Sequence, residues 1–134
     1  MGPAGIFMAT ILIVDDDECV RELLVLTLNQ LGHTCVEAAD GNKAIELFRL
    51  LCPDLIITDI SMPDRDGIEL IMDLRLEASK VPVIAISGNS KLKPLYLQMA
   101  RKLGAFEVLS KPFTLDQVRS LVSSVLSAAP QPVR

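Results

Sequence analysis

Short aliphatic runs alternate along the chain with longer segments in which apolar residues recur every three or four positions. Continuous aliphatic runs are typical of strands buried on both faces, and the longer spacing is typical of amphipathic helices. The pattern predicts strands over residues 10–14, 35–38, 55–58, 83–86 and 106–109. It predicts helices over about residues 18–31, 41–51, 68–77, 94–103 and 115–125.

Strands and helices that alternate in this way form β-α units on a parallel sheet. Five units without an internal repeat or a low-complexity linker predict an α/β fold, an open doubly wound sheet with helices on both faces. The 134 residues are close to the roughly 150 of one domain. We expect that domain to occupy residues 9–127, with flexible ends at 1–8 and 128–134.

Composition restricts the class of protein. Half of the residues are apolar but only 4% are aromatic, which predicts a globular domain with an aliphatic core. Cys19, Cys35 and Cys52 lack C-x-x-C spacing, so they are expected to be reduced packing residues rather than disulfide or zinc ligands. No apolar run approaches the roughly 18 residues of a membrane span, and no secretory leader is recognisable, so no membrane association and a cytoplasmic location are expected.

The charge of the chain is unevenly distributed. The net charge is −4, which argues against direct nucleic-acid binding. Residues 1–67 carry 4 basic and 12 acidic side chains, whereas residues 68–134 carry 9 and 5. The first half therefore concentrates the carboxylates.

Polar side chains follow four of the five predicted strands. In an open α/β sheet, ligands bind beyond the carboxyl ends of the strands. Those positions hold Asp15, Asp16 and Asp17 after the first strand, Asp59 after the third, Ser87 after the fourth and Lys111 after the fifth. We expect these groups to converge into one site.

The chemistry of such a site favours a magnesium ion and a phosphoryl group. Clustered carboxylates repel one another unless a cation neutralises them, and an all-oxygen ligand set suits Mg²⁺. A nearby lysine indicates that further negative charge arrives, and a carboxylate can attack phosphorus to form an aspartyl phosphate. Asp59 stands alone after an apolar strand, which favours it as the nucleophile, while Asp15 and Asp16 suit the metal.

Four segments together resemble the motifs of two-component response-regulator receiver domains. They are VDDD at 14–17, DISMPDRDG at 59–67, SG at 87–88 and KPF at 111–113, and the resemblance covers about residues 9–127. The combination of D-x-x-M-P-x-x-D-G with a later K-P-F is specific. The resemblance implies a flavodoxin-like five-stranded sheet with strand order 2-1-3-4-5 and five helices.

The resemblance also implies roles for individual residues. Asp59 matches the acceptor of a phosphoryl group from a sensor histidine kinase, a histidine phosphotransfer protein or a small phosphodonor. Asp16 and Asp59 match the side-chain ligands of Mg²⁺, with Asp15 close by and the backbone carbonyl of Ser61 as a further ligand. Ser87 matches the hydroxyl that moves to bond the phosphoryl group.

Lys111 matches the lysine of the family, with a cis bond to Pro112. The chain departs from the family at Val108, where an aromatic switch residue is usual. A shift of Ser87 and its loop would still remodel the surface that carries Lys91, Lys93, Arg101 and Lys102, where partner binding is expected.

Other polar residues receive structural interpretations. Asp17 is expected to cap a helix rather than bind metal, and Asp64 and Asp66 are expected to be turn residues. His33, the only histidine, is expected to lie in a loop on the solvent side. The lack of a second histidine argues that the chain is not its own histidine kinase.

Rival functions are tested against the same residues. The acidic triplet would repel a flavin phosphate, and the P-loop motif is absent. An aspartate-nucleophile phosphatase would need an acid where Ser61 stands. The remaining alternative is a non-phosphorylated receiver-like adaptor, which would normally lack Asp16, Asp59 or Lys111.

The sequence therefore predicts a signalling switch rather than a classical enzyme, one that slowly removes its own phosphoryl group. Only seven residues follow 127, so we expect a single-domain regulator or a receiver cut from a longer chain.

Overall fold

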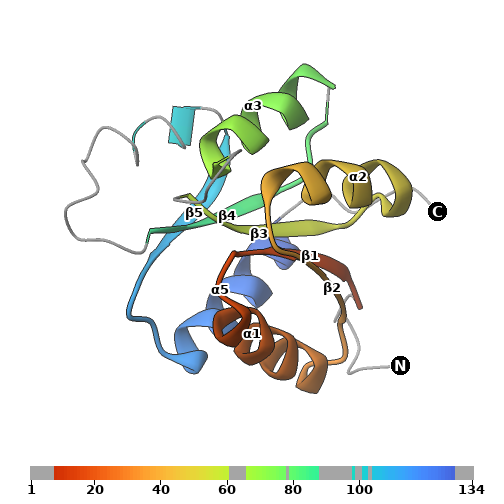
Figure 1. Ribbon diagram of the computed structural model, residues 1–134. Helices are drawn as coiled ribbons and strands as arrows, with labels where there is room; N and C mark the ends of the chain where they lie inside the picture. Colours follow the sequence, from red (N-terminus) through yellow and green to blue (C-terminus); the bar gives the residue numbers. More distant parts are fainter. Residues whose placement is uncertain are drawn as a thin grey trace.

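The chain folds into a five-stranded parallel sheet between two layers of helices (Figure 1). The computed structural model describes residues 8–60, 66–77, 79–87, 98, 101–102 and 104–128. The strands are β1 (Thr10–Val14), β2 (Thr34–Ala38), β3 (Leu55–Asp59), β4 (Val83–Ser87) and β5 (Ala105–Ser110). The helices are α1 (Glu18–Gln30), α2 (Gly41–Leu51), α3 (Gly67–Leu76) and α5 (Leu115–Ala128).

The strand order is β2-β1-β3-β4-β5, with every neighbouring pair parallel, so the predicted fold and strand order are confirmed. Four of the five predicted helices lie in the part of the chain that the structure describes. The fifth, predicted over residues 94–103, falls mostly outside the described residues. Among the helices of the described ranges, none is both long and apolar enough to cross a membrane.

The central strands are buried on both faces, and alternate residues belong to two separate cores. On β1, Leu12 and Val14 pack with α2 and α3, whereas Ile11 and Ile13 pack with α1 and α5. Figure 1 shows the same division, with α2 and α3 on one side of the sheet and α1 and α5 on the other. The continuous aliphatic runs follow from this arrangement because neither face of a central strand meets water.

Aspartates begin three of the helices. Asp17 caps α1 by accepting hydrogen bonds from the backbone N–H groups of Cys19 and Val20, as predicted. Asp40 caps α2 by accepting a 2.8 Å hydrogen bond from the backbone N–H of Lys43. Asp66, expected only as a turn residue, accepts a 2.9 Å hydrogen bond from the backbone N–H of Glu69 and caps α3. Capping uses one carboxylate for each helix and leaves the other acids of the β1 and β3 ends to be explained.

The solvent-side position predicted for His33 is wrong. His33 is only 7% exposed, and its Nδ1 accepts a 3.0 Å hydrogen bond from the backbone N–H of Ala9. The residue follows α1 and stands just before β2, where the parallel pairing of β2 with β1 places it beside the start of β1. The imidazole thus supplies an acceptor for a backbone group that the sheet leaves unpaired.

Packing roles were also predicted for all three cysteines, and two of these predictions are wrong. Cys19 and Cys52 are exposed, the first in the opening turn of α1 and the second at the left-handed C-cap of α2. Cys35 is half-buried against the core beneath α1 and α5. Burial, followed by the charge of Glu37, raises the pKa of the Cys35 thiol to about 11, which keeps it protonated.

Candidate functional site at the carboxyl ends of the strands

Asp15 and Asp59 lie side by side because they follow paired positions of neighbouring strands. Val14 of β1 pairs with Thr58 of β3, so the next residue on each strand brings a carboxylate to the same edge of the sheet. Both residues are buried, Asp15 at 0% and Asp59 at 4% exposure. The edge of the sheet therefore holds two acids that have little contact with water.

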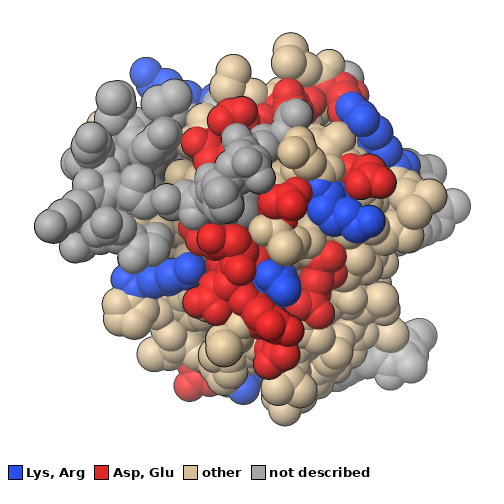
Figure 2. All heavy atoms as spheres, in the orientation of Figure 1, with Lys and Arg blue, Asp and Glu red and all other residues tan. Residues whose placement is uncertain are grey.

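Asp16 completes a cluster of three carboxylates. One carboxylate oxygen each from Asp15, Asp16 and Asp59 lies within 4.8 Å of the other two. Asp16 is exposed, whereas the other two are buried, so the cluster opens to solvent on the side of Asp16. Figure 2 shows acidic side chains gathered at the centre of the face that contains this edge of the sheet.

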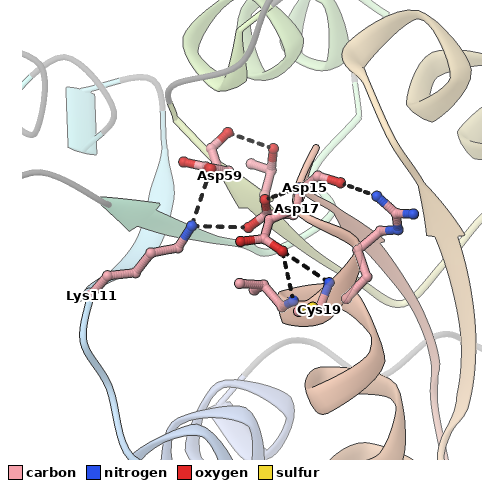
Figure 3. A network of polar contacts seen from close by, with 8 residues as sticks. Asp15, Asp17, Cys19, Asp59 and Lys111 are labelled. Atoms are coloured by element: carbon pink, nitrogen blue, oxygen red, sulfur yellow. Dashed lines mark hydrogen bonds and ion pairs between the residues drawn. The ribbon is translucent and has the colours of Figure 1, made fainter.

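Lys111 lies between the two buried acids (Figure 3). Its Nζ is 3.2 Å from Oδ2 of Asp15 and 3.3 Å from Oδ2 of Asp59. Burial lowers the pKa of the Lys111 ammonium, but the charges of Asp59 and Asp15 and their hydrogen bonds more than offset that effect and leave the pKa raised. The lysine is thus held protonated between the two acids, with its side chain 23% exposed.

Backbone pairing fixes the position of Lys111. Its N–H donates a 2.8 Å hydrogen bond to the carbonyl of Ser87, the last residue of β4. The bond between Lys111 and Pro112 is cis, as the resemblance implied. Ser87 is 6% exposed and stands one strand beyond β3, so three neighbouring strand ends and the segment after β5 all contribute to the site.

Asp15 is held by contacts around its whole backbone and side chain. Oδ1 accepts a 2.9 Å hydrogen bond from the N–H of Asp17, while Oδ2 faces Lys111. The backbone carbonyl of Asp15 accepts a 2.6 Å hydrogen bond from Nη1 of Arg21. Burial and then the charge of Asp59 nevertheless raise the pKa of Asp15, against the lowering effects of the Asp17 N–H and Lys111. The environment therefore disfavours a charged Asp15 when only Lys111 balances the two buried acids.

The segment after Asp59 requires a glycine. Gly67 donates a 2.9 Å hydrogen bond to the carbonyl of Ile60 at the start of α3. A Cβ on Gly67 would collide with the backbone carbonyl oxygen of Asp59 and lie 2.8 Å from Cα of Ile60. Only a residue without a side chain allows α3 to begin this close to the end of β3.

Two sequence expectations about this region have different outcomes. Ser61, expected to offer a backbone carbonyl to the metal, lies outside the described residues. Val108 is half-buried and packs against the core beneath α2 and α3, so the position of the usual aromatic residue faces inward here with an aliphatic side chain.

The sequence did not single out Arg21, although it contacts Asp15. Its Nε donates a 3.0 Å hydrogen bond to Oε1 of Glu37 on β2, so the guanidinium bridges two segments at the edge of the sheet. The periodicity of α1 gave no signal, because a lysine or arginine on a helix is usually solvated. The contact with Asp15 spans six residues, whereas the packing of α1 beside β2 brings the same guanidinium to Glu37.

The donor set fits a hard divalent cation. Three carboxylates without a nearby histidine or cysteine ligand suit Mg²⁺. This ion binds few carboxylates, keeps several of its waters and can also bind a phosphate oxygen. A cation between Asp15, Asp16 and Asp59 would also offset the burial and the charge of Asp59, which together raise the pKa of Asp15. The residues present therefore fit a magnesium site.

Comparison with known proteins places the chain among signalling proteins. The family model for the response regulator receiver domain matches residues 11–123. The "Regulator of RpoS" of Escherichia coli K12 is 38% identical over 117 residues, which cover 87% of this chain and 34% of that protein. The "DNA-binding transcriptional regulator NtrC" of Klebsiella pneumoniae is 33% identical over 86% of this chain and 24% of that protein. The chain thus spans about a third of the first relative and about a quarter of the second.

Solved structures of similar length agree with this. The Vibrio cholerae chemotaxis protein CheY4 superposes with a TM-score of 0.81 at 29% identity, over 89% of this chain and 99% of that one. The receiver domain of NtrX from Brucella abortus superposes with a TM-score of 0.82 at 27% identity, over 89% and 99%. The flavodoxin-like fold, the acidic cluster with its lysine and the family match lead to one conclusion: this chain belongs to the response regulator receiver domain family.

Proposed function

We propose that this receiver domain is a phosphoacceptor switch in which Asp59 takes a phosphoryl group. The observation that supports this most strongly is the buried Asp59 carboxylate, 3.3 Å from Nζ of Lys111 and within 4.8 Å of the Asp15 and Asp16 carboxylates. The donor is the phosphohistidine of a sensor histidine kinase or histidine phosphotransfer protein, or a small molecule such as acetyl phosphate. The family acts as a signalling module rather than a classical enzyme.

The transfer needs little covalent chemistry from the protein. An oxygen of Asp59 forms the new P–O bond as the bond from phosphorus to the donor breaks, and the donor leaves with that electron pair. Asp16, Asp59 and Asp15 would hold Mg²⁺, together with the backbone carbonyl of Ser61. When bound, the metal would neutralise charge on the phosphoryl oxygens. The same site would slowly hydrolyse the aspartyl phosphate.

Lys111 and Ser87 are proposed to change their contacts when Asp59 is phosphorylated. The Lys111 ammonium, already protonated beside Asp59, can move to form an ion pair with a phosphoryl oxygen. Its contact with Asp15 would then break, and Asp15 would be available to bind the metal. The Ser87 hydroxyl would bond another phosphoryl oxygen. The Ser87 carbonyl accepts the Lys111 N–H, so a movement of one strand end is transmitted to the other. Val108 supplies no ring to this movement, which leaves the loop of Ser87 as the part that shifts.

The proposed output is altered binding of a partner protein or of an effector domain on a longer chain. Arg101 and Lys102 follow Ser87 along the chain and are exposed. They belong to the basic surface that is expected to bind this partner. Lys91 and Lys93, expected in the same surface, lie outside the described residues. A Lys111→Ala variant should still bind Mg²⁺ through the three carboxylates but fail to change partner binding on phosphorylation.

The direct test is labelling by acetyl phosphate followed by intact-mass measurement. Wild type should gain one phosphoryl group only with Mg²⁺, and Asp59→Asn should gain none. Asp40→Asn is the matched control, because Asp40 caps α2 and asparagine caps helices equally well. Stoichiometric labelling of Asp59→Asn would assign the acceptor elsewhere.

Some receivers could reject a small donor, so a second measurement uses beryllium fluoride, which mimics a phosphoryl group on an aspartate. Wild type with Mg²⁺ should bind it, as seen by ¹⁹F NMR, and Asp59→Asn should not. If wild type neither gains a phosphoryl group nor binds beryllium fluoride, the chain is better described as a non-phosphorylated adaptor with the receiver fold.

A further inference from the structure

Arg21 joins the site to the neighbouring strand through two separate contacts. Its Nη1 donates to the backbone carbonyl of Asp15 at 2.6 Å, and its Nε donates to Oε1 of Glu37 at 3.0 Å. The Arg21 side chain is 15% exposed and that of Glu37 is 43% exposed. A guanidinium can make both contacts at once because its donors lie in a rigid plane.

The carbonyl that Arg21 contacts controls the direction of the next residue. This carbonyl belongs to the planar peptide unit between Asp15 and Asp16. Holding the carbonyl therefore fixes the orientation of the whole unit, which includes the Cα of Asp16. The N–H of Asp15 donates to the carbonyl of Ala38 at 3.1 Å, and its side chain accepts from the Asp17 N–H. The two peptides that flank Asp16 are therefore held separately: Arg21 contacts the Asp15–Asp16 peptide, and the Asp15 carboxylate contacts the Asp16–Asp17 peptide.

Asp16 is the carboxylate of the cluster that most needs such support. Asp15 and Asp59 are buried and are held by the sheet and by Lys111, whereas Asp16 is exposed. An exposed side chain in a loop would sample several directions, and holding it toward the other two carboxylates costs conformational entropy. Fixing its peptide in advance lowers that cost when a cation binds.

From this geometry we infer that Arg21, anchored by Glu37, is a positioning residue for the magnesium site, setting the Asp15–Asp16 peptide so that Asp16 faces Asp15 and Asp59. This inference rests on the proposed function, because it assumes that the three carboxylates bind Mg²⁺. Arg21 contacts the Asp15 backbone carbonyl and Glu37 rather than a carboxylate oxygen of the cluster. It acts through a backbone carbonyl, in the way that outer partners of metal ligands orient them.

Positioning and simple electrostatics predict opposite effects when Arg21 is removed. A guanidinium near three carboxylates repels an incoming cation, so an arginine that acted only through its charge would weaken Mg²⁺ binding, and Arg21→Ala would strengthen it. If Arg21 positions Asp16, Arg21→Ala weakens Mg²⁺ binding by about tenfold. The sign of the change therefore separates the two explanations.

The experiment titrates MgCl₂ into the full chain by isothermal calorimetry, at a temperature where circular dichroism shows each variant folded. Arg21→Ala and the charge-conserving double variant Arg21→Ala/Glu37→Gln should both bind Mg²⁺ about tenfold more weakly than wild type. The control is Arg49→Ala, which removes an arginine of the same charge from the Arg49–Glu77 ion pair between α2 and α3. It should leave the affinity unchanged.

Three further readouts make the test decisive. The Mg²⁺ concentration that gives half-maximal labelling by acetyl phosphate should rise with the dissociation constant in Arg21→Ala. The rate at saturating Mg²⁺ should fall less. In ¹H–¹⁵N spectra, the amides of Asp16 and Asp17 should move before any metal is added. Arg21→Lys, which keeps the charge but cannot make both contacts, should show an intermediate loss and serves if Arg21→Ala does not fold.

The outcomes distinguish the inference from the function on which it rests. If wild type binds no Mg²⁺, the proposed function fails. If wild type binds Mg²⁺ and Arg21→Ala binds it equally or more tightly, the positioning role is wrong. A lower melting temperature with an unchanged dissociation constant also overturns it, because it assigns Arg21 to stability alone.

Discussion

Val14 in the interior of the sheet and Asp15 at its carboxyl edge are equally buried, but their burial has opposite effects on stability. Val14 and Asp15 are neighbours on the chain, and each is 0% exposed. Burial of Val14 stabilises the fold by removing apolar area from water, whereas burial raises the pKa of Asp15 and disfavours its charge. The same backbone register that builds the core also carries acids into a place where they cost stability. The cost is concentrated where three carboxylates can receive a cation.

The largest expected effect lies on the interior side of this comparison. Ile57 of β3 is 1% exposed and packs in the core beneath α1 and α5. Ile57→Ala should lower the free energy of unfolding by about 3 kcal/mol, from lost burial and the remaining cavity. Urea denaturation measures this. A loss below about 1 kcal/mol would mean that the core collapses around the site or is loosely packed.

Gly67 tests how closely the two regions depend on each other. Gly67→Ala should cost about 2 kcal/mol, because the new methyl group pushes against the backbone of Asp59 and Ile60, and should also slow labelling of Asp59. Gly32→Ala is the control, since Gly32 has φ +92° but no atom within 4 Å of the added Cβ. It should cost about 1 kcal/mol of backbone strain and leave the labelling rate unchanged. Equal labelling rates for both variants would show that α3 can shift away from the end of β3 and make room for the added methyl group.

Asp15 tests the claim that the edge costs stability. Without Mg²⁺, Asp15→Asn should raise the free energy of unfolding by about 1 kcal/mol, because it removes one of two buried like charges. The ion pair between Lys111 and Asp59 remains in this variant. Mg²⁺ binding should weaken in the same variant. Asp40→Asn changes the charge equally at a helix cap and should be neutral for both properties. A destabilised Asp15→Asn would show that the hydrogen bonds of Asp15 outweigh the repulsion.

The smallest expected effect concerns His33, a buried polar group outside the site. Burial lowers the pKa of His33 below the 6.5 of an exposed histidine, so the unfolded chain takes up the proton first. The stability contributed by neutral His33 is present above about pH 6.5 and is lost as the pH falls through that value toward the lowered pKa. Protonation of Nδ1 would also remove the acceptor for Ala9.

His33→Asn retains an acceptor near Nδ1 but does not titrate in this range. The urea midpoint of wild type should therefore fall more than that of His33→Asn between about pH 7.5 and about pH 5.5. Parallel curves for the two proteins would mean that His33 does not change protonation on unfolding.

Most of the fold could be predicted from the sequence because the local signals were strong. Continuous aliphatic runs such as Leu55–Thr58 have few alternatives to a central strand, and Asp40 marks the start of a helix by its own side chain. Boundaries were less certain: α3 begins at Gly67 rather than Ile68, and β5 extends by one residue at each end. Strand order came from the family resemblance, since hydrophobic spacing alone does not say which strands are neighbours.

The candidate site was predicted in its residue types but not in its full set of contacts. Asp15, Asp16, Asp59 and Lys111 could be grouped from the sequence because parallel strands end at one edge. Arg21 and His33 could not be assigned, because a helix arginine and a loop histidine have no local pattern that reveals a buried partner. The exposed Cys19 and Cys52 show the same limit for residues expected to pack.

The amino-acid sequence by itself determined that the chain forms alternating strands and helices and which polar residues stand at the strand ends, because both depend on local order along the chain. The tertiary structure decided which of those residues meet and how they are held. The contact between Arg21 and Glu37, the position of Lys111 between two acids and the burial of His33 against Ala9 all join segments that are distant along the chain. Such contacts depend on how α1 and the segment after β5 pack on the sheet, which no local pattern records.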